Sequence, residues 1–216
     1  MIVEAIALRK TVDDFVFKSV GTDDPNGYSF SICFPLSVLL SLLNIEHEIT
    51  SGKANRKGVV VHHFWLTLEK NATIIDPTIR QFKASEKAVY IGKIEGNETT
   101  NSYTDRTRIE NVSTSPVYYS WSAPLFRKEP RISRSKEFES RTGLLNIRAA
   151  LTLIDYIRKH DLEDGFLTSA YAKAYLEPIV SYVRSVPGIA AALDTSTHRT
   201  PGEALDSLIE LYSRFR

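Results

Sequence analysis

The sequence predicts an α+β protein, because a buried helix is followed by a series of short strands. Within residues 33–43, leucines recur at the i, i+3, i+4 and i+7 spacing of one helix face. Residues 58–68 are rich in Val, Phe, Trp and Thr and are apolar on both faces, which suits a central strand. Residues 141–216 then show helical periodicity. A helix followed by several strands is typical of an α+β unit.

The first two predicted helices are separated by a turn. Residues 3–20 carry an imperfect apolar stripe, and the turn-forming residues 21–27 end this helix. The second helix, 33–43, has Pro35 in its first turn, where a missing N–H costs nothing. This placement puts Cys33 at or just before the helix N-terminus.

Short strands are predicted before and after the central strand. Composition divides the whole chain into three regions. The strands cover 46–50, 73–75 and 89–94, and a loop is expected at 51–53. C-terminal helices are expected at 144–159, 165–183 and 201–215, with Pro178 kinking the second. The predicted regions are a core at 1–98, a loop-rich connection at 99–140 with one or two strands, and a helical region at 141–216.

Composition and charge exclude several classes of protein. The chain has 216 residues, 43% hydrophobic and 25% charged, with a formal net charge of +1, so no global field points to nucleic acid or to a membrane surface. Cys33 is the only cysteine, which excludes an intramolecular disulfide and a Cys-rich zinc site. No apolar run is long enough to span a membrane, and the N-terminus lacks the features of a signal peptide. We therefore expect a cytoplasmic protein, although secretion by a route without a Sec-type signal stays open.

Three polar residues lie in otherwise apolar segments, namely Cys33, His63 and Asp76. A cysteine nucleophile needs a lowered pKa, which a helix N-terminus favours through its dipole and free N–H groups. It also needs an imidazole as its base, and the imidazole needs a third group to fix its tautomer. A helix start, a central strand and the next strand end are places from which these three groups can converge. The pattern predicts Cys33 as nucleophile, His63 as base and Asp76 as the orienting group.

The same residues carry a resemblance to a known family. The runs Cys33-Phe-Pro-Leu-Ser37, His63-Phe64-Trp65 and Ile74-Ile75-Asp76-Pro77-Thr78 resemble the Cys…His-x-Trp…Asp-Pro-Thr pattern of transglutaminase-like proteins, which belong to the wider papain-like group. The continuation through Gln81 and Phe82 is similar to the tail of small members. The resemblance covers about residues 27–82. It implies a papain/transglutaminase-like core, in which a Cys-bearing helix packs on an antiparallel sheet.

The resemblance also selects between two adjacent histidines. Strand alternation puts His63 and Trp65 on one face and His62 and Phe64 on the other. The His-x-Trp spacing of the family selects His63. Because the two histidines point to opposite faces, they cannot clamp one metal from this strand.

The activity implied by the resemblance is thiol chemistry on amide or acyl bonds. We expect a cysteine hydrolase (peptidase, amidase or protein-glutamine deamidase) that forms a thioester acyl-enzyme and needs no cofactor or metal. Two alternatives use the same core: a transglutaminase or acyltransferase, and an interaction domain that has lost turnover. The substrate is expected to be a protein, a peptide or a small amide. The C-terminal helices are candidates for binding a protein partner, whereas a membrane or nucleic acid is not expected.

The oxyanion partner is left open by the sequence. Position 27 is Gly, so the upstream glutamine of papain-like peptidases has no clear counterpart, and Asn26, Tyr28 and Gln81 are the candidates. Trp65 is either core packing or a wall of the substrate cleft. Each main candidate also has a purely structural interpretation: Cys33 as a small buried apolar residue, and Asp76 as a turn former that caps local N–H groups.

Overall fold

The computed structural model describes residues 2–21, 28–68, 73–84, 86–109 and 136–168. The chain divides into two compact units, residues 1–111 and 112–216. Helices and an antiparallel five-stranded sheet confirm the predicted α+β class. The predictions for Asn26, for Pro178, for the helix at 201–215 and for most of the 165–183 helix lie outside the described residues.

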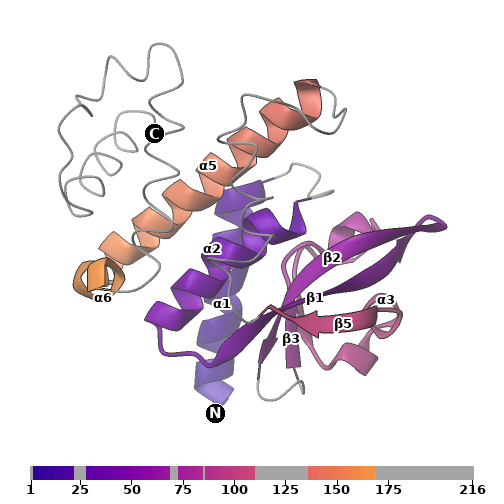
Figure 1. Ribbon diagram of the computed structural model, residues 1–216. Coiled ribbons are helices and arrows are strands. Elements are labelled where there is room, and N and C mark those ends of the chain that lie inside the picture. The colour runs from indigo at the N-terminus through magenta and orange to yellow at the C-terminus, as the bar shows by residue number, and fades with distance from the viewer. Residues whose placement is uncertain (1, 22–27, 69–72, 85, 110–135, 169–216) are drawn as a thin grey trace. The chain divides into compact units, whose positions relative to one another are not determined.

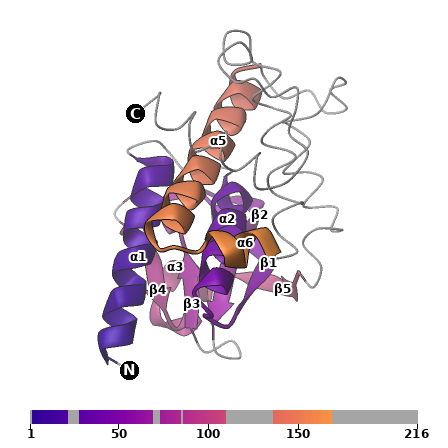
Figure 2. The ribbon, with the colours of Figure 1, turned by 90° about the vertical axis from the view of Figure 1, so that its left-hand side faces the viewer.

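Two helices open the first unit, and both lie on the same side of its sheet (Figures 1 and 2). Helix α1 spans Ile2–Val20, as predicted, and buries Val12, Phe15 and Val16. Helix α2 spans Ser29–Leu42 and is buried on all sides from Ser29 to Leu40. Such all-round burial is expected of a helix that is apolar around its whole circumference.

The start of α2 corrects the sequence prediction. The helix begins at Ser29 instead of Cys33, so Cys33 lies a full turn inside it and Pro35 lies in the helix interior. Tyr28 makes no side-chain capping bond at this end, so packing of the apolar surface, rather than a capping residue, determines where the helix starts. Pro35 has no N–H to donate to the carbonyl of Ser31. The first-turn argument for Pro35 was therefore wrong, and Cys33 is not at a free helix N-terminus.

Hydrogen bonds of His47 connect the first strand to α2 and to the turn that follows it. Asn44, with φ 56°, turns the chain after the helix, and strand β1 (His47–Arg56) follows. The His47 Nδ1–H donates to the carbonyl of Ile45 at 2.7 Å, and the Ser37 hydroxyl donates to Nε2 at 2.7 Å. Burial lowers the pKa of His47 by more than its hydrogen bonds raise it, so the imidazole is neutral at neutral pH and Nε2 can accept from Ser37.

We expect the free energy of unfolding to fall as the pH drops below about 6.5, the pKa of an unfolded histidine. The folded protein holds His47 neutral, so the unfolded chain binds more protons between the two pKa values, and stability is lost there. The slope for one group is at most about 1.4 kcal/mol per pH unit. Urea unfolding at several pH values measures it. His47→Gln should flatten the dependence, leaving the part due to His62, whose pKa partial burial also lowers. Equal slopes in both proteins would contradict this role.

The sheet has the strand order β4-β3-β2-β1-β5, and all its pairs are antiparallel. Strand β2 (Val59–Leu68) is central, as predicted. The loop expected at 51–53 is wrong, because these residues pair with β2 within one long strand. The remaining strands are β3 (Thr73–Asp76), β4 (Tyr90–Gly92) and β5 (Thr104–Arg108).

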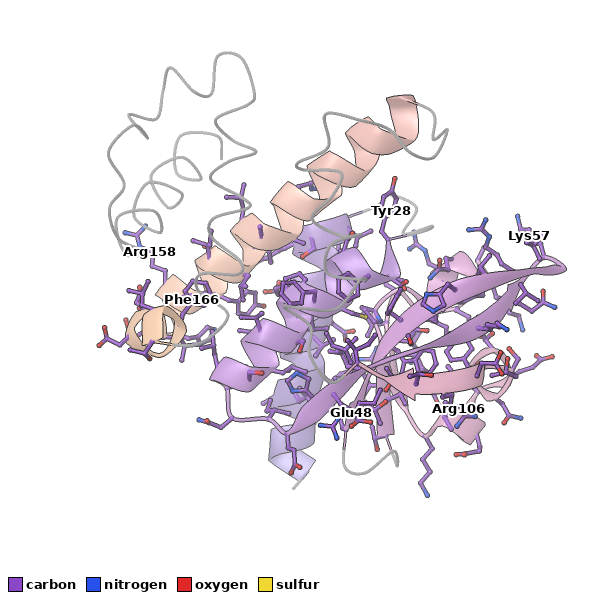
Figure 3. The ribbon with its side chains drawn as sticks, viewed as in Figure 1. Tyr28, Glu48, Lys57, Arg106, Arg158 and Phe166 are labelled. Carbon is purple, nitrogen blue, oxygen red and sulfur yellow. The ribbon has the colours of Figure 1, made fainter. Side chains whose placement is uncertain are left out.

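The β1–β2 hairpin closes through a two-residue turn. Arg56 pairs with Val59, and the turn residues Lys57 and Gly58 have φ values of 51° and 84°. Positive φ at both positions is the signature of a type I′ turn, whose twist matches that of the strands. The Asn55 side chain accepts a hydrogen bond from the Gly58 N–H at 2.8 Å. Lys57 marks the tip of the hairpin in Figure 3.

The two faces of the sheet are covered differently. On one face, Phe30 of α2 packs edge-on against Phe64 with ring centroids 5.0 Å apart. On the other, a hydrophobic cluster is formed by Ala54, Trp65, Ile74, Ile94 and Tyr103. Short helices in the connections from β3 to β5 contribute to this side: η1 (Ile79–Gln81), η2 (Ile94–Gly96) and α3 (Glu98–Asn101).

The described part of the second unit is helical. Helix α5 spans Lys136–Lys159, starting earlier than the predicted 144, and α6 spans Glu163–Thr168. Asp161, with φ 53°, turns the chain between them. Among the helices of the described residues, none combines the length and the apolar character needed to cross a membrane.

Candidate functional site

The centre of the candidate site is a buried pair of side chains from neighbouring strands. His63 lies in β2 and Asp76 ends β3, and these strands pair directly. The His63 Nε2–H donates to Asp76 Oδ2 at 2.8 Å, and both side chains are fully buried. The structure thus brings together two of the three residues that the sequence selected for one site.

Asp76 is held by further donors. The Tyr103 hydroxyl donates to Oδ2 at 2.5 Å, and the Thr78 backbone N–H donates to Oδ1 at 2.9 Å. The Thr78 hydroxyl lies 3.4 Å from Oδ1. A buried carboxylate is stable only where its oxygens accept such bonds. The bond to Thr78 N–H also fits the turn-former interpretation of Asp76, so the one carboxylate both shapes the Asp-Pro-Thr turn and accepts from His63.

The hydrogen bonds define one tautomer of His63. A carboxylate without a proton only accepts, so the proton of the neutral ring is on Nε2 and the lone pair is on Nδ1. The Gln81 side-chain amide donates to Nδ1 at 3.3 Å and to the Thr78 hydroxyl at 3.0 Å. Nδ1 is therefore the ring atom that can take a proton, and this is the tautomer that a general base requires.

Aromatic rings enclose the imidazole. The centroid of the His63 ring lies 4.7 Å from that of Phe82, 5.1 Å from that of Tyr103 and 5.8 Å from that of Trp65. Removing water from around the pair strengthens the hydrogen bond and fixes the ring plane. Trp65 thus acts here as packing beside His63, whereas its role toward a substrate stays a prediction.

Cys33 lies close to this pair but does not bond to it. Its thiol donates to the backbone carbonyl of Phe64, the residue after His63, at 3.4 Å. The side chain is fully buried. Burial raises the thiol pKa well above its ordinary value, and the negative charge of Asp76 raises it further. The lowered pKa expected from a helix N-terminus is therefore wrong, because Cys33 is buried and lies inside α2 rather than at its free end. The thiol is protonated.

The other sequence candidates take separate positions. Gln81 contacts His63, while Tyr28 is buried at the start of α2. Asn26 lies outside the described residues. His62 lies on the opposite face from His63, with its ring edge against Phe64 at 4.8 Å.

Tyr103 is the residue of the site that the sequence did not indicate. It is buried and lies just before β5, inside a polar stretch predicted to be loop-rich with one or two strands. No spacing rule connects it to Asp76, 27 residues earlier. Only the return of the chain to the edge of the sheet brings the two residues together.

Comparison with known protein families, with curated proteins and with solved structures finds no match to this chain.

Proposed function

We propose that this chain is a cysteine-dependent hydrolase of amide or ester bonds, with Cys33 as nucleophile, His63 as base and Asp76 as the orienting group on a papain/transglutaminase-like core. The observation that carries the proposal is the buried 2.8 Å bond from His63 Nε2–H to Asp76, which leaves Nδ1 as the proton acceptor. The contact of the Cys33 thiol with the backbone next to His63 supports the choice of nucleophile.

In the proposed reaction, His63 takes the proton of the Cys33 thiol and gives a proton to the leaving group. The Cys33 S–H proton passes to His63 Nδ1 while the sulfur forms a bond to the carbonyl carbon of the substrate. Collapse of the tetrahedral intermediate breaks the bond to the leaving group, which takes the proton from Nδ1, and a thioester remains. Water then attacks the thioester, gives its proton to Nδ1, and Cys33 recovers a proton as the acid is released. Asp76 stabilises the imidazolium at each stage without taking its proton.

Turnover by this scheme requires three departures from the described state. The thiol must become accessible to a substrate, since Cys33 is fully buried, and its hydrogen bond must change from the Phe64 carbonyl to Nδ1. The Gln81 amide must also leave Nδ1. It is then free to donate to the developing oxyanion, which is the role the sequence left open for it.

The test uses p-nitrophenyl acetate as a reporter of acyl transfer. We expect a burst of nitrophenolate and an acetyl group on Cys33 in the trapped intermediate, found by peptide mass spectrometry. Cys33→Ser should abolish the burst, and His63→Gln should slow it by about 100-fold or more. His62→Gln is the matched control, because its ring lies on the other face of β2, and it should behave as wild type. A burst that survives both Cys33→Ser and His63→Gln would refute the scheme. If added amine rather than water takes the acetyl group, the same site is an acyltransferase.

The second candidate function is that of an interaction domain without turnover. It is favoured by the complete burial of Cys33, which also raises the pKa of the thiol. An interaction domain has no need of a thiolate or of a path by which a substrate reaches the sulfur, so a buried, protonated thiol fits this function. In that case the hydrogen bond between His63 and Asp76 would stabilise the pairing of β2 with β3, and Cys33 would pack in the core as a small apolar side chain.

Alkylation separates the two functions. If the chain is an interaction domain, iodoacetamide should modify Cys33 slowly at every pH until urea unfolds the protein. If it is a hydrolase, prior treatment of the native protein with p-nitrophenyl acetate should acylate Cys33. That treatment should then protect it when the protein is briefly unfolded in iodoacetamide at neutral pH, where a free thiol is alkylated. The readout in both cases is the fraction of Cys33 peptide that carries each adduct.

A further inference from the structure

Two hydrogen-bond donors share one oxygen of the buried carboxylate. Asp76 Oδ2 accepts from His63 Nε2–H at 2.8 Å and from the Tyr103 hydroxyl at 2.5 Å, while Oδ1 accepts from Thr78. The scheme proposed above uses only the first of these bonds. The shorter one, from Tyr103, has no part in it.

Tyr103 also contacts the imidazole directly. Its ring meets the His63 ring at an angle of 65° with centroids 5.1 Å apart, and it packs against Trp65 at 5.0 Å and Phe82 at 5.8 Å. The residue is buried, with its ring inside the hydrophobic cluster and its hydroxyl on Asp76. It therefore touches both members of the pair, one by packing and the other by a hydrogen bond.

We propose that Tyr103 is a positioning residue that sets the strength of the hydrogen bond between His63 and Asp76. Two donors on one oxygen compete for the same electron density, so each weakens the other. A bond to an ionised acceptor in a site without water is strong, which makes the competition large. Burial and Asp76 raise the pKa of Tyr103, so the hydroxyl keeps its proton and remains a donor.

Loss of the hydroxyl has a definite consequence for the pair. In Tyr103→Phe, Oδ2 accepts from His63 alone, so the carboxylate attracts the Nε2 proton more strongly and stabilises an imidazolium better. The consequence for turnover rests on the proposed function, in which His63 is the base. In the variant, His63 is then protonated at higher pH. The acid limb of the pH–rate profile moves to higher pH, and kcat falls at neutral pH while KM changes little.

The decisive measurement does not depend on turnover. In protein labelled with ¹⁵N-histidine, the His63 Nε2–H proton should give a low-field ¹H resonance that disappears in His63→Gln. In Tyr103→Phe this resonance should move further downfield. Tyr90→Phe is the matched control, because the Tyr90 ring packs on the same cluster but its hydroxyl donates to the carbonyl of Lys93. That variant should leave the resonance in place.

A second variant keeps the test valid if Tyr103→Phe fails to fold. Site-specific 3-fluorotyrosine at position 103 keeps the ring and the hydroxyl but makes the hydroxyl a stronger donor, so the resonance should move upfield. Opposite shifts in the two variants, or the upfield shift alone where Tyr103→Phe does not fold, support the proposal. A resonance unmoved in a folded Tyr103→Phe or in the fluorotyrosine protein overturns it. If wild type shows no acetyl-enzyme but the resonance responds as expected, the proposed function fails and the positioning role of Tyr103 stands.

Discussion

Asp76→Ala should lower the free energy of unfolding by about 3–5 kcal/mol, since it leaves several buried donors without an acceptor at about 1–3 kcal/mol each. His63 Nε2–H, the Tyr103 hydroxyl and the Thr78 backbone N–H all donate to this carboxylate, and the methyl group of alanine replaces none of these bonds. Urea unfolding followed by circular dichroism measures the change, with the slope of the transition checked for constancy.

Asp13→Ala provides the matched control for that experiment. Asp13 also accepts a short hydrogen bond, from Arg9 at 2.6 Å, but it lies on α1 with 45% of its side chain exposed. An exposed pair four residues apart on a helix contributes only about 0.3–0.5 kcal/mol. If Asp76→Ala cost no more than Asp13→Ala, the buried network would not be stabilising the sheet, and the site would need another interpretation.

Gly52→Ala should destabilise the protein by about 1–3 kcal/mol, the range for overpacking a filled core. Gly52 pairs with His63 across β1 and β2. A Cβ at this position would lie 2.7 Å from the Thr104 carbonyl oxygen and 2.7 Å from Cη2 of Trp65. The first neighbour is backbone and the second is a fully buried indole, so neither can move freely. Thermal and urea unfolding measure the loss.

A double-mutant cycle with Trp65 identifies the cause. Trp65→Leu removes the indole, so adding Gly52→Ala should then cost less than it does in the wild-type background. The clash with the Thr104 carbonyl remains, so the rescue should be partial. Strictly additive effects would show that the indole is not what excludes a side chain from position 52.

The strands and the histidine–aspartate pair were within reach of sequence analysis because local pattern determines them. The apolar run at 58–68 predicted the central strand, and alternation along it separated His63 from His62. Asp76 was recognisable as a polar residue at a strand end before Pro77. Their hydrogen bond follows from the pairing of adjacent strands, which short connections favour.

The features that sequence analysis missed depend on tertiary packing. Helix α2 starts at Ser29 without a capping side chain, because burial of Phe30 and Ile32 extends it beyond the point where Pro35 predicted its first turn. The same extension removed Cys33 from the helix end, and burial together with the charge of Asp76 raises its pKa instead of lowering it. Tyr103 could not be found from spacing, since its contact with Asp76 is made across the fold.

The strand order has a consequence for the two hydrogen bonds that Asp76 Oδ2 accepts. Strands β1 to β4 each pair with a sequence neighbour, but β5 returns to the far edge beside β1, and all its residues are exposed. Edge segments with few buried contacts separate from a sheet at less cost than its centre. Tyr103 directly precedes this strand, whereas His63 and Asp76 belong to the interior. Loss of the β5 pairing would free one end of the segment that carries Tyr103, the second donor to Asp76, whereas the bond from His63 to Asp76 would stay between paired strands.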